Sequence, residues 1–310
     1  MSLELGGKRV FVAGHTGLLG QALVRRLADE GCEILTATRA ELDLTRQAEV
    51  EAWMDQARPD AVFLAAARQG GLFDHIHCPA EMILQNLQIQ TNVMEAARRT
   101  GVAKLLAVGS AAAYPPEAPQ PVREAALLTG APEAAHIPYG VAKIAGVALA
   151  DALRRQYGCD FITAMPINLY GPGMSFDPER SGVAAGTLRR LHEAKTAGAA
   201  AFTVWGTGQA RRELLYADDA AEACVLLMRE WSGEGPVNLG SGADISIAEL
   251  AQTAAEVVGF DGALEFDASK PEGAPRRLLD GRILAALGWR PRVSLKDGLE
   301  TSYRAFLASS

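Results

Sequence analysis

Three glycines at three-residue spacing follow a short apolar segment near the start of this chain, and they constrain its fold more than any other feature. Residues 8–13 predict a strand, and Gly14, Gly17 and Gly20 follow it directly. Residues 21–30 then repeat apolar side chains at helical spacing. Such a unit binds the pyrophosphate of a dinucleotide, because glycines let the backbone approach it and the helix N-terminus attracts its charge. We therefore predict a dinucleotide site at Gly14, Thr16, Gly17, Leu18, Leu19 and Gly20.

Predicted strands and helices alternate over the first half of the chain. Apolar segments typical of buried strands recur at residues 32–38, 61–67, 104–110 and 161–166. Helical spacing of apolar residues recurs between them at residues 45–56, 82–100 and 139–157. This alternation predicts an α/β fold with a doubly wound parallel sheet of the Rossmann type, whose ligands bind at the carboxyl ends of the strands.

The pattern becomes less regular after Gly171, where glycine and proline are frequent. Shorter elements are predicted at residues 186–196, 202–205 and 218–230, with a loop at 198–201. We therefore expect a smaller C-terminal lobe that binds substrate. The predicted division assigns residues 1–168 and a returning segment at about 214–240 to the nucleotide-binding Rossmann domain, and residues 169–213 and 241–310 to the substrate-binding lobe.

Composition narrows the class of protein further. The chain has 310 residues, 49% of them hydrophobic, which suffices for a large core, and its net charge of −7 argues against a general nucleic-acid surface. No apolar run reaches the roughly 18 residues of a membrane span, and the N-terminus lacks a signal-peptide pattern. The four cysteines and five histidines show neither disulfide nor metal-site spacing. We expect a cytoplasmic enzyme without a bound metal.

Tyr139 and Lys143 stand four residues apart at the start of a predicted helix. At this spacing both side chains lie on one helical face, about 5–6 Å apart at Cβ. A nearby ammonium favours the phenolate, so we predict that Lys143 lowers the pKa of Tyr139 from about 10. Such a tyrosine can donate a proton to a carbonyl oxygen as hydride arrives. Ser110, at the end of a predicted strand, would present its hydroxyl to the same site, although each residue alone also fits an ordinary helix or turn.

Arg39 follows the second predicted strand, where dinucleotide-binding domains place the residue that contacts the adenosine ribose. An acidic residue there suits the 2′-hydroxyl of NAD, whereas an arginine suits the 2′-phosphate of NADP. The residue type therefore favours NADPH as the cofactor. The alternative is a solvated surface arginine.

These residues, in this order and spacing, resemble the extended short-chain dehydrogenase/reductase superfamily. The likeness is closer still to the GDP-L-fucose synthase family, and it extends over about residues 8–300. The motifs that carry it are Ala65-Ala66-Ala67-Arg68-Gln69-Gly70-Gly71, Pro138-Tyr139-Gly140-Val141-Ala142-Lys143, Met165-Pro166-Ile167-Asn168-Leu169-Tyr170-Gly171-Pro172, Val204-Trp205-Gly206-Thr207-Gly208, Arg212-Glu213, and Lys270-Pro271-Glu272-Gly273 with Leu279-Asp280.

The resemblance implies NADPH-dependent reduction of the C4 ketone of a nucleotide-linked, GDP-type 4-keto-deoxy sugar. It implies that Tyr139 protonates the C4 oxygen, that Lys143 supports Tyr139 and holds the nicotinamide ribose, and that Ser110 hydrogen-bonds the ketone. Further cofactor contacts are implied for Leu64, Ala65, Ala66, Ala67, Pro166, Asn168 and Leu169. Contacts to the GDP-sugar are implied for Asn168, Arg190, Trp205, Arg212 and Asp280.

The sequence departs from that family at the residues that invert the sugar's C3 and C5 centres. The family carries a cysteine two residues after the catalytic serine, where this chain has Ala112, and a histidine where this chain has Gly182. Neither alanine nor glycine can move a proton. Side chains that could replace them are Cys78, His75, His77, Asp177 and Glu179, which also fit incidental surface positions. We therefore expect reduction, with epimerisation at C3 and C5 doubtful.

Two other functions remain open at this stage. A nucleotide-sugar 4-epimerase shares the Ser, Tyr and Lys but keeps NAD tightly bound, whereas Arg39 favours NADP. A non-catalytic NADP-binding regulator would not need Ser110, Tyr139 and Lys143. The superfamily also often forms homodimers through two helices, for which the apolar faces at residues 82–100 and 139–157 are candidates.

Overall fold

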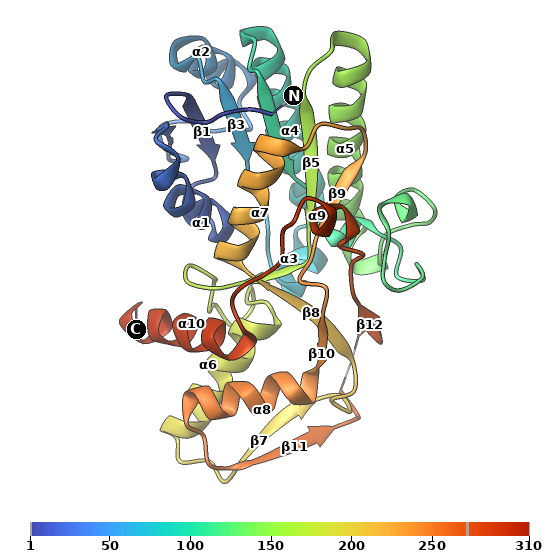
Figure 1. Ribbon diagram of the computed structural model, residues 1–310. Helices are drawn as coiled ribbons and strands as arrows, with labels where there is room; N and C mark the ends of the chain where they lie inside the picture. Colours follow the sequence, from blue (N-terminus) through green and yellow to red (C-terminus); the bar gives the residue numbers. More distant parts are fainter. Residues whose placement is uncertain (1, 271–272, 310) are drawn as a thin grey trace.

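The structure, a computed structural model, describes residues 2–270 and 273–309 (Figure 1). Pro271 and Glu272, which belong to the motif that begins at Lys270, lie outside the described residues.

Parallel strands form the main sheet. Within the described part of the chain it contains six strands in the order β2-β1-β3-β4-β5-β9. These are β1 (Arg9–Ala13), β2 (Glu33–Leu35), β3 (Ala61–Leu64), β4 (Lys104–Val108), β5 (Phe161–Pro166) and β9 (Pro236–Leu239). Every neighbouring pair runs parallel. The predicted Rossmann-type sheet is confirmed, with β2, β3 and β4 shorter than the predicted 32–38, 61–67 and 104–110.

Helices cover both faces of this sheet (Figure 1). Successive residues of β1 serve opposite faces, because side chains alternate along a strand: Val10 and Val12 pack in one apolar cluster, and Phe11 and Ala13 in the other. The first cluster includes side chains of α1 (Leu18–Leu27) and α7 (Ala217–Glu230). The second includes side chains of α2 (Gln47–Ala57), α4 (Pro79–Thr100) and α5 (Ile137–Tyr157).

Helix α1 begins at Leu18, three residues before the predicted start at residue 21. Gly17 is its N-cap, with extended backbone, so the helix starts inside the glycine motif itself. The prediction placed the motif in a turn between the strand and the helix, as a dinucleotide-binding unit requires. The earlier start points the unpaired N–H groups of the first helical turn at the space beside the glycines.

The second lobe lies below the sheet in Figure 1 and has its own apolar core. This core is formed by α6 (Val183–Thr196), α8 (Ile247–Val258), α10 (Leu295–Ser309) and the parallel pair β7 (Ala201–Trp205) and β11 (Ala263–Asp267). Between the lobes, β8 (Arg211–Tyr216) pairs with β6 (Asn168–Tyr170), β10 (Asp244–Ser246) and β12 (Arg276–Arg277). The remaining helices are α3 (Leu72–His77) and α9 (Arg282–Ala286).

The last part of the chain does not stay in the second lobe. Leu279, Leu284 and Trp289 pack in the same apolar cluster as Val10 and Val12 of β1. The predicted division placed residues 241–310 together, so the structure differs from it at this segment. These apolar side chains cover the sheet beside β9. A sequence pattern shows that a segment is apolar, but it does not show which part of the fold the segment packs against.

Within residues 2–270 and 273–309, no helix is long and apolar enough to cross a membrane. The same residues contain no group of three or more His, Cys, Asp or Glu side chains that could hold a metal ion.

Candidate active site

A cavity of about 970 Å³ opens at the carboxyl ends of β1, β3, β4 and β5. The wall includes Gly14 after β1, Ala65 after β3, Ser110 after β4 and Pro166 at the end of β5. Ligands of doubly wound sheets bind at this edge, so the cavity lies where the sequence predicted it. Its wall continues into the second lobe through Arg212.

The glycine motif forms one end of this cavity, and its backbone packing excludes side chains. A Cβ at Gly14 would lie 2.6 Å from the backbone of Ala66, and one at Gly20 would lie 2.0 Å from the carbonyl oxygen of Gly14. Gly14 also has a φ of +87°, which other residues rarely adopt. The motif therefore leaves a bare backbone surface at the N-terminus of α1, which fits a pyrophosphate.

Arg39 lies on the cavity wall on the β2 side of the glycine motif. Its side chain is 72% exposed, and its guanidinium is 3.9 Å from the carboxylate of Asp43. An exposed pair at this distance is weak, so Arg39 is available to a phosphate group. This position fits the predicted contact with the 2′-phosphate of NADP.

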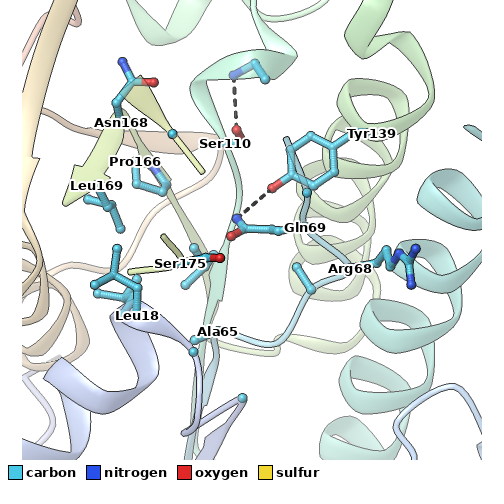
Figure 2. Close-up of a pocket in the computed structure, with 18 of the residues that line it drawn as sticks. Leu18, Ala65, Arg68, Gln69, Ser110, Tyr139, Pro166, Asn168, Leu169 and Ser175 are labelled. Atoms are coloured by element: carbon cyan, nitrogen blue, oxygen red, sulfur yellow. Dashed lines mark hydrogen bonds between the residues drawn. The ribbon is translucent and has the colours of Figure 1, made fainter. Parts of the chain in front are cut away.

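Tyr139 and Ser110 face each other at the other end of the cavity (Figure 2). Tyr139, in the first turn of α5, is only 5% exposed. Its phenol oxygen accepts a hydrogen bond from Gln69 Nε2 at 3.2 Å. The Ser110 hydroxyl caps the short helix Ala111–Ala113 by accepting from Ala112 N at 3.2 Å. The hydrogen bond from Gln69, in the loop after β3, thus holds the phenol of Tyr139 at the cavity wall.

The predicted effect of Lys143 on Tyr139 differs from the structure. Burial raises the pKa of Tyr139, and hydrogen bonds with Gln69 and Ser110 oppose that rise only in part. Lys143 is 6% exposed, and its ammonium donates to the carbonyl oxygen of Val108 at 2.7 Å. It lies 5.6 Å from the centre of the Tyr139 ring. Burial lowers the pKa of Lys143 to about 8. Desolvation, which the sequence cannot show, therefore sets the direction of the Tyr139 pKa, and Lys143 is not among the causes of its shift.

Two histidines from separate segments meet beside Tyr139. His75 of α3 and His136, the N-cap of α5, both line the cavity, and their ring centres are 4.5 Å apart. The His75 ring also meets the Tyr139 ring edge-on, with centres 5.6 Å apart. Ala112 and Gly182 line the same cavity. The sites of the missing acid and base therefore lie on the cavity wall, as the resemblance implied.

The structure brings most of the predicted site residues to one cavity. Those on its wall are Gly14, Thr16, Gly17, Leu18, Leu19, Gly20, Arg39, Ala65, Ala66, Ala67, Ser110, Tyr139, Pro166, Asn168, Leu169 and Arg212. Leu64 and Lys143 lie behind it as buried residues. Of the possible replacement acids and bases, His75 lies on the wall, whereas Cys78, His77, Asp177 and Glu179 do not.

The remaining residues predicted to contact substrate lie away from the wall. The Arg190 guanidinium lies 5.8 Å from the centre of the Trp205 ring, and that tryptophan is 55% exposed in the second lobe. The Asp280 carboxylate is paired with Arg282 at 2.9 Å and with Arg123 at 3.5 Å. The structure does not join these three side chains to the cavity, and their contacts with substrate stay a prediction.

Sequence reasoning missed Gln69, His136 and Arg277 as residues of the cavity wall. Gln69 stands inside a motif that carried the family resemblance, but the motif gave no role for its amide. His136 precedes Tyr139 by three residues, so helical spacing could have placed it on the same side of α5. Arg277 offered no such signal, because β12 reaches the cavity only through its pairing with β8.

Comparison with known proteins agrees with the family resemblance of the sequence motifs. A sequence profile of the NAD dependent epimerase/dehydratase family matches residues 10–240. GDP-L-fucose synthase 1 of Arabidopsis thaliana is 51% identical over 300 residues, which cover 96% of this chain and 93% of that protein.

Solved structures of similar proteins share the whole fold. The GDP-6-OMe-4-keto-L-xylo-heptose reductase of Campylobacter jejuni superimposes with a TM-score of 0.90 at 30% identity, over 100% of both chains. MlghC, a GDP-mannoheptose C4 reductase of the same organism with NADP bound, gives a TM-score of 0.88 at 30% identity over 98% of this chain and 99% of that one.

The lowered pKa of Lys143 predicts how ketone reduction at this site depends on pH. The charged ammonium stabilises the phenolate that forms when Tyr139 gives up its proton, so kcat/KM should fall as the pH rises through about 8. The measurement is kcat/KM between pH 6 and 10, because this ratio reports the ionisation of the free enzyme. Lys143→Met should be slower and should lack this decline. A decline that persists unchanged in Lys143→Met would assign it to another group.

The hydrogen bond from Gln69 predicts a role in holding the phenol. Gln69→Leu keeps the side-chain volume but removes the donor, so kcat should fall roughly tenfold, the equivalent of one hydrogen bond. The KM for NADPH should stay unchanged, because the amide lies at the far end of the cavity from the glycine motif. Gln156→Leu, on the exposed last turn of the same α5 helix, is the matched control. An unchanged kcat in Gln69→Leu would contradict the role.

Proposed function

This chain belongs to the NAD dependent epimerase/dehydratase family, and we propose that it is an NADPH-dependent reductase of the C4 ketone in a GDP-linked 4-keto-deoxy sugar. One observation carries the proposal: a single cavity joins the bare glycine backbone at one end to Tyr139 and Ser110 at the other. This arrangement suits a dinucleotide that reaches from the glycine motif to the proton donor. The names of its relatives, which are GDP-L-fucose synthases and GDP-heptose reductases, support a GDP-linked sugar as the substrate.

The residues present fit NADPH, which supplies hydride when bound. Gly14, Gly17 and Gly20 would receive the pyrophosphate, and Arg39 would receive the 2′-phosphate. MlghC, which is solved with NADP bound, supports this cofactor. The resemblance assigns the nicotinamide ribose to Lys143, whose buried ammonium lies behind the wall and donates to Val108; it would have to turn into the cavity to make that contact.

The protein's own part in the reaction is to place and protonate the ketone. Ser110 would donate a hydrogen bond to the C4 oxygen, and Tyr139 would transfer its phenol proton to that oxygen as the alcohol forms. Burial raises the pKa of Tyr139, so the proton is present at neutral pH before the reaction begins. Gln69, which donates to the phenol oxygen, would stabilise the negative charge that remains after transfer.

Epimerisation at C3 and C5 does not form part of the proposal. Ala112 and Gly182 line the cavity at the positions where the family resemblance places the acid and the base. A methyl group and a hydrogen cannot exchange protons with the carbons beside a ketone.

The two alternatives explain fewer observations. A 4-epimerase that keeps NAD would not need Arg39 on the cavity wall. A non-catalytic regulator would not need a buried Tyr139 held by Gln69 next to Ser110. No contact in the cavity favours either of them over the reductase.

The oligomeric state and the cellular location of the protein are also proposals. A homodimer across α4 and α5 is supported by exposed apolar side chains on both helices, Leu84 and Val141. A cytoplasmic location is supported by the scattered cysteines, all of which are free in the structure.

The direct test is oxidation of NADPH, followed at 340 nm, with GDP-, UDP- and dTDP-linked 4-keto-6-deoxy sugars. We expect turnover with the GDP-linked sugar, a higher KM with NADH than with NADPH, and a loss of at least about 100-fold in kcat for Tyr139→Phe because the proton donor is gone. The variant should still bind NADPH. Turnover with only the UDP- or dTDP-linked sugars would refute the GDP assignment.

The missing acid and base predict little exchange of the C3 and C5 hydrogens. Incubation with the ketosugar in D₂O without NADPH should leave both positions protonated, as measured by mass spectrometry or NMR. Ala112→Cys combined with Gly182→His should introduce exchange, because a Cβ at Gly182 would meet no atom within 4 Å and a histidine therefore has room. Clear deuterium incorporation by the unmodified protein would show that other side chains perform this step.

A further inference from the structure

We propose that His75 and His136 form a hydroxyl-binding pair that selects ketosugars carrying a free hydroxyl group near the ketone, either on C3 or on the exocyclic carbon C6. This inference rests on the proposed reductase function and adds a specificity-determining contact to it. It concerns the wall of the cavity that the reacting sugar carbons would face, next to Tyr139.

Position is the first argument. Three rings form a continuous row along this wall, from His136 to His75 at 4.5 Å and from His75 to Tyr139 at 5.6 Å between centres. The C4 oxygen must lie at the Tyr139 phenol to receive its proton. The carbons that flank C4, and the groups they carry, then lie within a side chain's reach of this row.

Unused hydrogen-bonding capacity is the second argument. His75 is only 8% exposed, and its Nδ1 atom is shielded from solvent without a partner among the residues that the structure describes. Its Nε2 atom also makes no hydrogen bond within that part of the chain. Nε2 is not shielded in this way, so it is the ring nitrogen that a ligand hydroxyl can reach and pair with. Such a side chain on a cavity wall is therefore suited to binding a polar group.

Neighbouring groups make one of the two rings a hydrogen-bond donor and the other an acceptor. His136 Nδ1 lies 3.7 Å from the carboxylate of Glu133, which favours the tautomer with its proton on Nδ1 and leaves Nε2 as an acceptor. In His75 the shielded Nδ1 is the better place for the bare nitrogen, because a buried N–H without an acceptor is rarely tolerated. His75 Nε2 is then a donor. A donor and an acceptor side by side match a hydroxyl group, which both accepts and donates.

Burial, more than the charged groups around it, keeps the pair neutral rather than cationic. Burial lowers the pKa of His75, as does the neighbouring His136, while the Asp74 carboxylate acts in the opposite direction. Asp74 itself is paired with Arg68 at 3.7 Å and Arg180 at 3.4 Å. Burial also lowers the pKa of His136, where Glu133 opposes the effect and Arg277 adds to it. Arg277 in turn pairs with Glu133 at 3.1 Å.

The test compares three GDP-linked substrates: a 4-keto-6-deoxyhexose with a 3-hydroxyl, its 3-deoxy analogue, and a 4-ketoheptose with a hydroxyl on C6. The variants are His75→Phe and His136→Phe, which keep an aromatic ring but remove the nitrogens. His77→Phe is the matched control, since His77 is an exposed residue of the same short helix and lies off the cavity wall. Binding of NADPH, measured by fluorescence, checks that each variant is folded.

We expect each cavity variant to lower kcat/KM roughly tenfold for the substrate whose hydroxyl the pair binds, mainly through KM, as the loss of one hydrogen bond predicts. The substrate without that hydroxyl should be affected less than about twofold. A 3-deoxy analogue that is insensitive to the variants identifies the 3-hydroxyl. A 6-deoxyhexose that is insensitive while the heptose is impaired identifies the exocyclic hydroxyl.

Two results would overturn the inference. The first is an equal loss with all three substrates, which would mean that the histidines support Tyr139 or the fold instead. The second is exchange of C3 or C5 hydrogens with D₂O in the unmodified protein that His75→Phe or His136→Phe abolishes, because the pair would then be an acid and base. If the unmodified protein reduced none of the three substrates, the proposed function itself would fail, which is a distinct outcome.

Discussion

Helix α5 is tied to the end of strand β4 by a buried hydrogen bond, from the Lys143 ammonium to the carbonyl oxygen of Val108 at 2.7 Å. The rest of the candidate site depends on this contact. It fixes the first turn of α5, which carries Tyr139, against the segment that carries Ser110. Burying an ammonium costs free energy, and the lowered pKa of Lys143 reflects that cost. The hydrogen bond to Val108 offsets part of it while holding the Tyr139 and Ser110 segments together.

A second buried group links the two lobes across the cavity. Glu213 of β8 is fully buried and accepts hydrogen bonds from the backbone N–H groups of Gly242 and Leu279, both at 2.7 Å. Its own carbonyl oxygen accepts from Asn168 at 3.0 Å. The Glu213 carboxylate thus joins segments from both lobes. Its neighbour in the sequence, Arg212, lies on the cavity wall.

The wall around Tyr139 combines two small residues with several polar ones. Ala112 and Gly182 line it where the family resemblance places an acid and a base, while Gln69, His75 and His136 supply polar groups on the same wall. The polar groups are held by ring contacts, by a hydrogen bond to the phenol and, at His136, by the Glu133 carboxylate. Neutral polar side chains of this kind are suited to binding and orienting a ketosugar, and Tyr139 is placed to protonate it.

The sequence by itself determined the class of sheet, the glycine motif and the candidate residues Ser110, Tyr139 and Lys143. These features depend on local patterns, namely apolar periodicity, glycine at a strand–helix turn, and four-residue spacing on a helix. The sequence also identified Ala112 and Gly182 as departures from the family. The tertiary structure decided the direction of the pKa of Tyr139, which burial sets, and the return of Leu279, Leu284 and Trp289 to the sheet. It alone brought His75 of α3 against His136 of α5, two side chains 61 residues apart, because contacts between distant segments depend on packing that no local pattern records.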